Sequence, residues 1–208
     1  MNEPLKILAI ETSTTGCSAA LLVQSKIDTS PIFYEIWENA PRRHTELILP
    51  MLDEVLQQAN CDLSEIDALA FGCGPGAFTG VRIATSVIQA ISYATKIKVI
   101  SVSSLAALAQ GVMRTQGDTQ CVVASDARMN EIYIGCYHNQ NGYMTLHGEE
   151  KLLKPELLAS YINDFCYQYP HWTAVGSGWQ EYQQVIGSQI PQFQTIKKTS
   201  DCLPYAQE

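Results

Sequence analysis

The sequence has few charged side chains. Only 16% of its 208 residues are Asp, Glu, Lys or Arg, where about a quarter is typical, and the formal net charge is −8. Lysine and arginine are scattered apart from two pairs, Arg42-Arg43 and Lys197-Lys198, so there is no basic stripe for a nucleic-acid backbone. We expect that the chain does not hold RNA or DNA by itself and that part of its uncharged surface meets another protein.

The sequence also lacks a long apolar run. No window approaches the length of a membrane span, and the apolar run near the N-terminus is too short for a secretory leader. None of the seven cysteines forms a C-x-x-C pair, and Cys17, Cys121 and Cys136 lie in apolar or small-residue segments, as reduced core thiols do. These features predict a cytoplasmic protein with no membrane segment.

Familiar catalytic and metal-binding motifs are missing as well. The four histidines are widely separated and none lies in H-E-x-x-H, which argues against a zinc site. Ser86 and Ser177 are not in a G-x-S-x-G nucleophile elbow. The turn GPGAFTG at 74–80 is neither the dinucleotide fingerprint nor a P-loop. We therefore predict no catalytic residue and no metal ligand in this chain.

The sequence does contain a pattern of residues that occurs twice. An apolar strand ends on an acid, a short polar turn follows, and a strand of small residues leads away, first over Leu5 to Leu22 and again over Cys121 to Tyr137. Each copy is followed later by an apolar strand that runs into closely spaced glycines and a helix, ALAFGCGPGAFTGV and then TAVGSGWQEY. The repetition predicts two related halves that face each other across a cleft.

Two interpretations of this repeat stay open. Glycine turns let backbone N–H groups approach phosphate oxygens, and Glu11 or Asp126 at the strand ends could then hold Mg²⁺. Alternatively, each acid accepts hydrogen bonds from the amides of its own turn, and the glycines serve packing alone.

Hydrophobic periodicity predicts strands and helices in both halves. The helices expected at His44 to Ala59 and Thr79 to Ala94 are apolar over a wider arc than one core-facing stripe needs, so a face is left for a partner or for a further layer of the fold. Pro50 is expected to kink or loosen the first of these helices. A linker at Gly117 to Thr119 divides residues 1–117 from residues 118–208. The other predicted elements are strands at 31–37, 66–71, 99–102, 143–149 and 173–175 and helices that begin near 104, 155 and 178.

Six segments of the sequence closely resemble the bacterial TsaB (YeaZ) family of tRNA threonylcarbamoyladenosine biosynthesis proteins. They are, in order, ILAIETSTTGCSAALL, HTELILPMLDEVL, LAFGCGPGAFTGVRI, SVSSLAALAQG, DARMNEIYIGCY and VGSGWQ. The resemblance implies an α/β fold of two related subdomains of the actin-like, Hsp70-like ATPase (ribonuclease H-like) type, with mixed sheets flanked by helices. Family members usually continue beyond the region of DCLPYAQE, so the second subdomain is expected to be abridged at its end.

The resemblance also implies a function. Members of the family associate with a catalytic paralogue, TsaD, and with the ATPase TsaE, in the complex that transfers threonylcarbamoyl to N6 of adenosine 37 in tRNAs reading ANN codons. By this resemblance the chain is a non-catalytic scaffold or activator that requires no cofactor, whereas its partner subunits use ATP and a metal ion. The tRNA is expected to be bound only through the complex.

The resemblance places the H-x-x-x-H metal ligands of the catalytic paralogue at Ser104 to Leu108 of this sequence. Serine and leucine replace the two imidazoles there and cannot serve as ligands for a catalytic metal. The active site is therefore expected to be vacated, and what remains of the clamp is expected to be a relic that preserves the fold. The vestigial cofactor-binding candidates are Glu11, Thr12, Ser13, Asp126, Gly176 and Gly178.

In this family two helices of the first subdomain pair with the same helices of the paralogue, or of a second copy in a homodimer, as a helical bundle. The wide apolar arcs of the two predicted helices suit such a bundle. A charge at Met51 or Ile88 is accordingly predicted to abolish complex formation. The predicted partner-interface residues are His44, Leu47, Ile48, Met51, Val55, Val81, Ala84, Thr85 and Ile88.

Two other functions stay open at this stage. One is an active nucleotide-dependent enzyme of the same fold, either a small-molecule kinase or a metallo-hydrolase, which would need a catalytic base and metal ligands that the sequence does not show. The other is a self-contained homodimer that binds a small ligand in the cleft.

Overall fold

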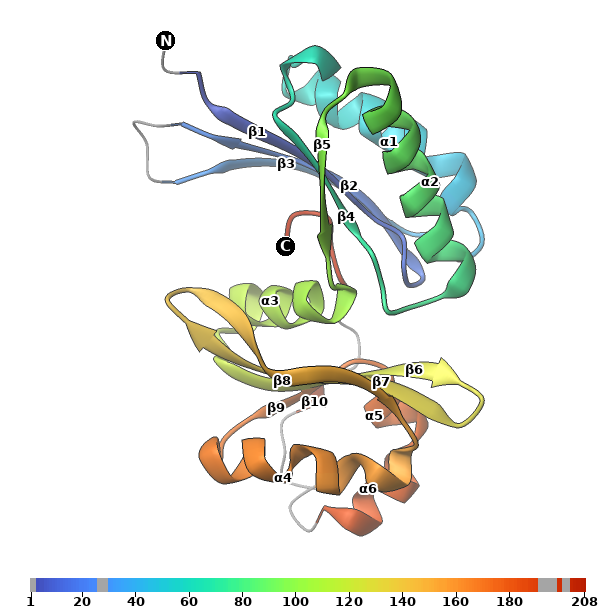
Figure 1. The fold of residues 1–208 in the computed structure, drawn as a ribbon, viewed down its shortest axis with the longest axis vertical. Helices are drawn as coiled ribbons and strands as arrows, with labels where there is room; N and C mark the ends of the chain where they lie inside the picture. The colour runs from blue at the N-terminus through green and yellow to red at the C-terminus, as the bar shows by residue number, and fades with distance from the viewer. Residues whose placement is uncertain (1–2, 26–29, 191–197, 200–202) are drawn as a thin grey trace. The chain divides into compact units, whose positions relative to one another are not determined.

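The computed structural model describes residues 3–25, 30–190, 198–199 and 203–208. The chain divides into two compact units, Met1–Ser104 with Pro204–Glu208 and Leu105–Leu203. Figure 1 labels the elements along the chain. Their order and bounds are β1 (Leu5–Glu11), β2 (Gly16–Gln24), β3 (Ile32–Asn39), α1 (His44–Gln58), the 3-10 turn η1 (Leu63–Glu65), β4 (Ala68–Gly72), α2 (Phe78–Thr95), β5 (Lys98–Val102), α3 (Ser104–Gln116), β6 (Gln120–Arg128), β7 (Glu131–Gln140), β8 (Tyr143–Leu153), the 3-10 turn η2 (Pro155–Leu157), α4 (Leu158–Gln168), β9 (Thr173–Val175), α5 (Gly178–Glu181), α6 (Gln183–Gln189) and β10 (Lys198–Thr199).

The first unit is a five-stranded mixed sheet with two helices on one face. Its strand order is β3-β2-β1-β4-β5. The β1–β2 and β2–β3 pairs are antiparallel, whereas β1–β4 and β4–β5 are parallel. Helices α1 and α2 lie side by side on the same face of this sheet (Figure 1). The parallel pairs need crossover connections, and these two helices provide them.

The core of the first unit forms where this sheet face meets the two helices. Alternate residues of β1, among them Leu8 and Ile10, point toward α1 and α2 because side chains alternate between the faces of a strand. The helices answer with apolar residues at helical spacing, including Ile48 and Val55 of α1 and Ile88 of α2, all fully buried. Burial of these side chains is the main driving force that holds the helices on the sheet.

The second unit repeats the topology of the first. Its sheet has the order β10-β9-β6-β7-β8, which is the order of the first sheet with β6 to β8 in place of β1 to β3 and with β9 and β10 in place of β4 and β5. The β6–β7 and β7–β8 pairs are antiparallel, and β6–β9 and β9–β10 are parallel. The predicted fold class, α/β with two related units of mixed sheet flanked by helices, is confirmed.

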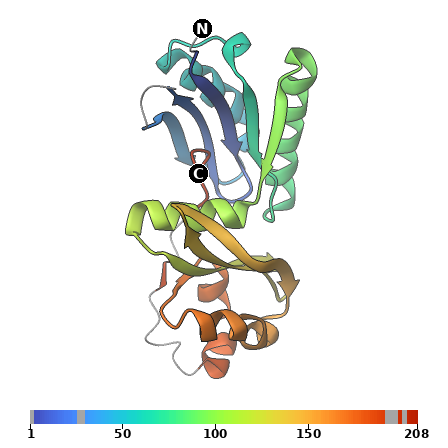
Figure 2. The same ribbon diagram turned by 60° about the vertical axis from the view of Figure 1, so that its left-hand side comes forward.

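The second sheet is covered on both faces. Helices α4 and α6 pack on one face around Phe165 and Ile186, and α3 packs on the other face through Leu108 and Val112 (Figures 1 and 2). Because α3 contributes its apolar side to this core, the division between the units falls between Ser104 and Leu105, one helix earlier than the linker expected from the sequence.

Three further details differ from the sequence-based expectations. Helix α1 runs through Pro50 without a break. The helix expected from residue 178 divides at Tyr182 into α5 and α6, and the short strand β10 was not predicted. Within the described residues, no helix combines the length and the apolar character that crossing a bilayer requires.

The buried position of Ile88 gives a first testable prediction. Ile88→Asp places an unpaired carboxylate among apolar side chains, so we expect the free energy of unfolding to fall by about 4 kcal/mol or more in urea denaturation. Gln89→Asp, at the next and exposed position of α2, is the control and should cost less than about 1 kcal/mol. Equal losses for the two variants would contradict the packing described here.

Candidate functional site

Glu11 ends β1 and is buried, with 2% of its surface exposed. Its Oε1 accepts a hydrogen bond from the Ser13 backbone N–H, and its Oε2 accepts one from the Ser104 hydroxyl at 2.8 Å. A Cβ atom on Gly72 would lie 1.8 Å from Oε2, so only glycine leaves room there for the carboxylate. Both oxygens of Glu11 are thus engaged inside the first unit, where they join the end of β1 to the start of α3.

Burial also changes the acidity of this carboxyl group. Desolvation raises the pKa of Glu11 above its ordinary value of 4.5, and the hydrogen bonds from Ser13 and Ser104 oppose this effect without cancelling it. The charged form is therefore less favourable in the folded protein than in water.

The glycine turn before α2 packs against the turn between β1 and β2. A Cβ atom on Gly80 would lie 2.0 Å from the Thr12 carbonyl oxygen, and one on Gly76 would lie 2.4 Å from the Ser13 carbonyl oxygen. The Ala77 N–H donates to the Ser13 carbonyl at 2.7 Å, and the Thr12 hydroxyl donates to the Gly80 carbonyl at 2.8 Å. These glycines allow the backbone of the β1–β2 turn to lie where a side chain at residue 76 or 80 would otherwise be.

Asp126 lies near the end of β6 in the second unit, as the internal repeat predicts. Its Oδ1 accepts hydrogen bonds from the Arg128 N–H at 2.8 Å and from the Tyr182 hydroxyl at 2.9 Å, and its Oδ2 forms an ion pair with the Arg128 guanidinium at 3.0 Å. The Asp126 N–H donates to the Ser177 hydroxyl at 3.2 Å. Asp126 thereby organises the β6–β7 turn and connects it to the segment after β9.

The glycines of the second unit act as those of the first do. A Cβ atom on Gly176 would lie 2.6 Å from the Ala124 carbonyl oxygen, and one on Gly178 would lie 3.0 Å from the same carbonyl group. Gly176 also has a φ of +99°, which favours glycine for a second reason. The turn after β9 can therefore lie this close to β6 only because Gly176 and Gly178 have no side chains.

These contacts bear on the two interpretations of the repeat. The structure brings Glu11, Thr12 and Ser13 together in the first unit, and Asp126, Gly176 and Gly178 together in the second. The four carboxylate oxygens are all occupied by partners from the chain itself. These contacts are the ones that the second interpretation expects, in which acids and glycines serve turn formation and packing.

Ser104 and Leu108, where the sequence resemblance places the metal ligands of the paralogue, both make contacts within the fold. The Ser104 hydroxyl donates to Glu11, and Leu108 lies in the core between α3 and the second sheet. In the residues that the structure describes, no three His, Cys, Asp or Glu side chains are grouped as metal ligands would be.

The predicted partner interface requires a correction. Ile48, Met51, Val55, Ala84 and Ile88 lie in the core of the first unit, with at most 5% of each side chain exposed, so they face the sheet and not a partner. The remaining members of the predicted set differ in burial. His44 is buried with Nε2 3.1 Å from the Gly16 carbonyl oxygen, and Leu47, Val81 and Thr85 are half-buried.

The outer surface of the same helices carries different residues. Leu49 of α1 is 54% exposed and Phe78 of α2 is 73% exposed. Between the helices runs a groove of about 360 Å³. Arg82 flanks this groove with its guanidinium carbon 3.1 Å from the centre of the Phe78 ring, a cation–π contact. The groove is lined by Thr45, Ile48, Leu49, Phe78, Thr79, Arg82, Ile83, Ser86 and Val87.

Comparison with known proteins identifies the family. A family model described as "TsaD: tRNA N6-adenosine threonylcarbamoyltransferase" matches residues 36–203. The tRNA threonylcarbamoyladenosine biosynthesis protein TsaB of Escherichia coli K12 is 39% identical over 181 residues, which cover 86% of this chain and 74% of that protein. The TsaB of Haemophilus influenzae is 36% identical over 190 residues, which cover 86% and 75%. The chain belongs to the TsaB (YeaZ) family.

A solved structure agrees with this assignment. YeaZ from Pseudomonas aeruginosa superposes with a TM-score of 0.82 at 39% sequence identity, covering 97% of this chain and 87% of that one. The fold that the sequence resemblance implied is therefore confirmed for this TsaB-family chain.

The outward residues of the TsaB-family helices could have been found in the sequence. Leu49 directly follows Ile48, which belongs to the core stripe of α1, so Leu49 points away from that stripe. Phe78 opens α2 six residues before Ala84, the first buried side chain of that helix. A large apolar residue that lies outside the core-facing stripe of its helix was the sequence feature that could have predicted these exposed positions.

Gly80 gives a prediction in which the direction of the change in the free energy of unfolding is informative. In most helix interiors Gly→Ala stabilises by up to about 1 kcal/mol, whereas here the new methyl group meets the Thr12 carbonyl. We expect Gly80→Ala to lower the free energy of unfolding by about 2 kcal/mol or more in urea denaturation. Ser86→Ala, at an exposed position of the same helix, should change it little. A stabilised Gly80→Ala variant would show that the turns do not pack this closely.

Glu11 gives a prediction about pH. Because its pKa is raised in the folded state, its contribution to stability is greatest below the unfolded value of 4.5 and is lost as pH rises through the folded pKa. Glu11→Gln keeps hydrogen-bonding capacity but does not titrate. Relative to wild type, the free energy of unfolding of this variant should therefore increase as the pH rises above the ordinary carboxyl value of 4.5.

The matched control is Glu3→Gln, which changes an exposed carboxylate of the same unit. Urea denaturation across the pH range should show no such trend for it. If the difference between Glu11→Gln and wild type stays constant with pH, Glu11 does not have a raised pKa.

Proposed function

We propose that this chain is a non-catalytic scaffold or activator in the formation of N6-threonylcarbamoyladenosine in tRNA, acting by binding a TsaD-like catalytic paralogue and a TsaE-like ATPase. The printed names of its relatives support the pathway, since the E. coli and H. influenzae proteins are biosynthesis proteins for this nucleoside. The match to a TsaD family model supports descent from a common fold with the transferase.

The chemistry of the vestigial site supports a non-catalytic role. A transferase centre needs groups that can bind a metal or meet a substrate. In this chain the carboxylates of Glu11 and Asp126 are taken by internal hydrogen bonds, and Ser104 and Leu108 stand where the resemblance places imidazoles. In this proposal ATP and the metal ion belong to the partner subunits, and tRNA is reached through the assembled complex.

The single observation that carries the binding proposal is the apolar groove between α1 and α2. Leu49 and Phe78 expose large apolar side chains at this groove, and Ile48 is a fully buried lining residue. Apolar side chains presented around a hollow surface are typical of helix-in-groove recognition. We assign this groove to the helices of the TsaD-like paralogue.

The charges around the groove are consistent with a hetero-complex. The outer side of α1 carries the exposed acids Glu46, Asp53 and Glu54, whereas Arg82 is the cation on the α2 side. A paralogue helix with basic residues facing α1 and an acid facing Arg82 would complement this pattern, and complementary charges select a partner more than they add affinity.

Two substitutions at the groove test this assignment. Leu49→Asp and Phe78→Asp replace exposed apolar groups with charges, so each should weaken binding to the purified TsaD-like paralogue by about 100-fold or more in isothermal titration. The fold should tolerate both changes. Residue 78 lies in the first turn of α2, where an acid interacts favourably with the helix dipole.

The controls are matched by exposure in the second unit. Leu157 is 55% exposed and Tyr167 is 91% exposed, so Leu157→Asp and Tyr167→Asp introduce the same charge outside the groove. They should bind the paralogue like wild type. Full binding by the two groove variants, or equal loss in the controls, would refute the assignment of the groove. Threonylcarbamoyl transfer or ATP turnover by the chain alone would refute the non-catalytic role.

A further inference from the structure

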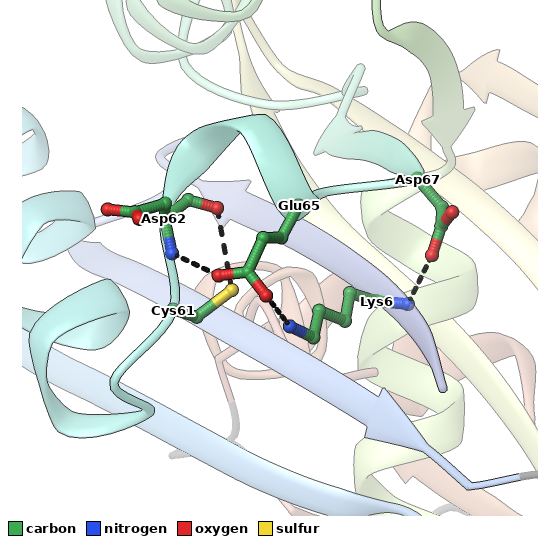
Figure 3. A network of polar contacts seen from close by, with 5 residues as sticks. All are labelled: Lys6, Cys61, Asp62, Glu65 and Asp67. Carbon is green, nitrogen blue, oxygen red and sulfur yellow. Dashed lines mark hydrogen bonds and ion pairs between the residues drawn. The ribbon is translucent and has the colours of Figure 1, made fainter. Parts of the chain in front are cut away.

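A second group of reactive side chains lies away from the groove, at the corner where β1 meets the segment after α1. Figure 3 shows the Lys6 ammonium, the Cys61 thiol and the Glu65 carboxylate pointing toward one another. Lys6 Nζ is 2.7 Å from Glu65 Oε1. The Cys61 thiol donates a hydrogen bond to the Asp62 carbonyl at 3.5 Å, and it lies near enough to both charged groups for their charges to shift its pKa.

The backbone around these side chains is held on both sides. The Lys6 N–H donates to Asp67 Oδ2 at 2.8 Å, and the Asp67 N–H donates to the Lys6 carbonyl at 3.0 Å. In η1, Glu65 Oε2 accepts the Asp62 N–H at 2.8 Å as part of a capping box. Thiol and amine are therefore presented to each other by ordered elements, at 16% exposure of the Lys6 side chain and partial exposure of Cys61.

The pKa values of Lys6 and Cys61 determine the pH range in which the amine and the thiol can react. The ion pair with Glu65 raises the pKa of Lys6. Burial raises the pKa of the Cys61 thiol, and the neighbouring Lys6 charge opposes that shift. Since the thiolate is the form that reacts with peroxides, oxidation of Cys61 should be slow at neutral pH and faster as pH rises.

We propose that Cys61 and Lys6 are a redox-modification site at which hydrogen peroxide produces a covalent Sγ–Nζ crosslink. Peroxide first oxidises the thiol to a sulfenic acid and is itself reduced, releasing one water. The Lys6 ammonium loses a proton to the solvent, and the free amine attacks the sulfur. The S–N bond forms as the S–O bond breaks, and the leaving hydroxide takes up a proton as the second water. The sulfenamide product has two hydrogens fewer than the reduced chain.

The crosslink would join β1 to the end of the α1 segment. The closed loop contains β2, β3 and α1, which are three neighbours in the first unit. Covalent closure of a loop stabilises a fold by restricting the unfolded chain. Oxidation at this site should therefore stabilise the unit that carries the groove, and thiol reductants should reverse the change.

The experiment treats the full chain with hydrogen peroxide at about pH 8 and analyses it by intact mass and by peptide mapping. We expect a peptide pair joined through residues 6 and 61 with the mass of two hydrogens lost. The melting temperature should rise by about 5 °C, and dithiothreitol should restore both the mass and the melting temperature.

Two variants and one internal control make the result decisive. Lys6→Arg keeps the ion pair with Glu65 but removes the amine, and Cys61→Ser removes the sulfur, so neither should crosslink or gain melting temperature. Cys73, an exposed thiol of the same unit, should take up oxygen in all samples and so reports that peroxide was active. Oxygen addition at Cys61 with Lys6 unmodified, or an unreacted Cys61 beside an oxidised Cys73, would overturn the proposal.

Discussion

The close packing of the glycine turn against the β1–β2 turn is the contact on which the first unit depends. Gly76 and Gly80 lie against the carbonyl groups of Ser13 and Thr12 at distances that no side chain would permit. The same two turns are joined by the Ala77–Ser13 hydrogen bond. This contact fixes where α2 begins, because the helix starts at the residue after Ala77. The glycine turn, which resembles a phosphate-binding turn, thus positions the start of α2.

Much of this fold could be predicted from the sequence because the same pattern of strands, acids and glycines occurs in both halves of the chain. The acid at the end of each first strand and the glycines after each later strand appear in both halves, and the two sheets have the same strand order. Periodicity located α1 and α2 because their buried residues recur at helical spacing. Periodicity does not show which neighbouring element covers the apolar face of a helix. The sequence predicted that Ile48 and Ile88 would meet a partner, and the structure shows that they pack in the core of their own unit.

The same limit explains the unit boundary. Gly117 and its neighbours have the composition of a linker, and residues 117–119 do form an irregular segment between α3 and β6. Helix α3 nevertheless belongs with the second unit, because Leu108 and Val112 find their apolar partners on the second sheet. Linker composition marks where the backbone turns, whereas a domain boundary depends on where the apolar side chains pack, and only contacts between distant residues determine that.

The glycine turn and the groove are connected through α2. Phe78 is the first residue of this helix, and it directly follows Ala77, whose N–H is bound to the β1–β2 turn. Gly80, one turn into the helix, packs on Thr12 and holds the Phe78 side of α2 against the sheet. Packing alone therefore constrains the residues around these turns. If the groove binds the paralogue, as proposed, the old clamp is retained because it sets the position of the aromatic side chain that meets the partner.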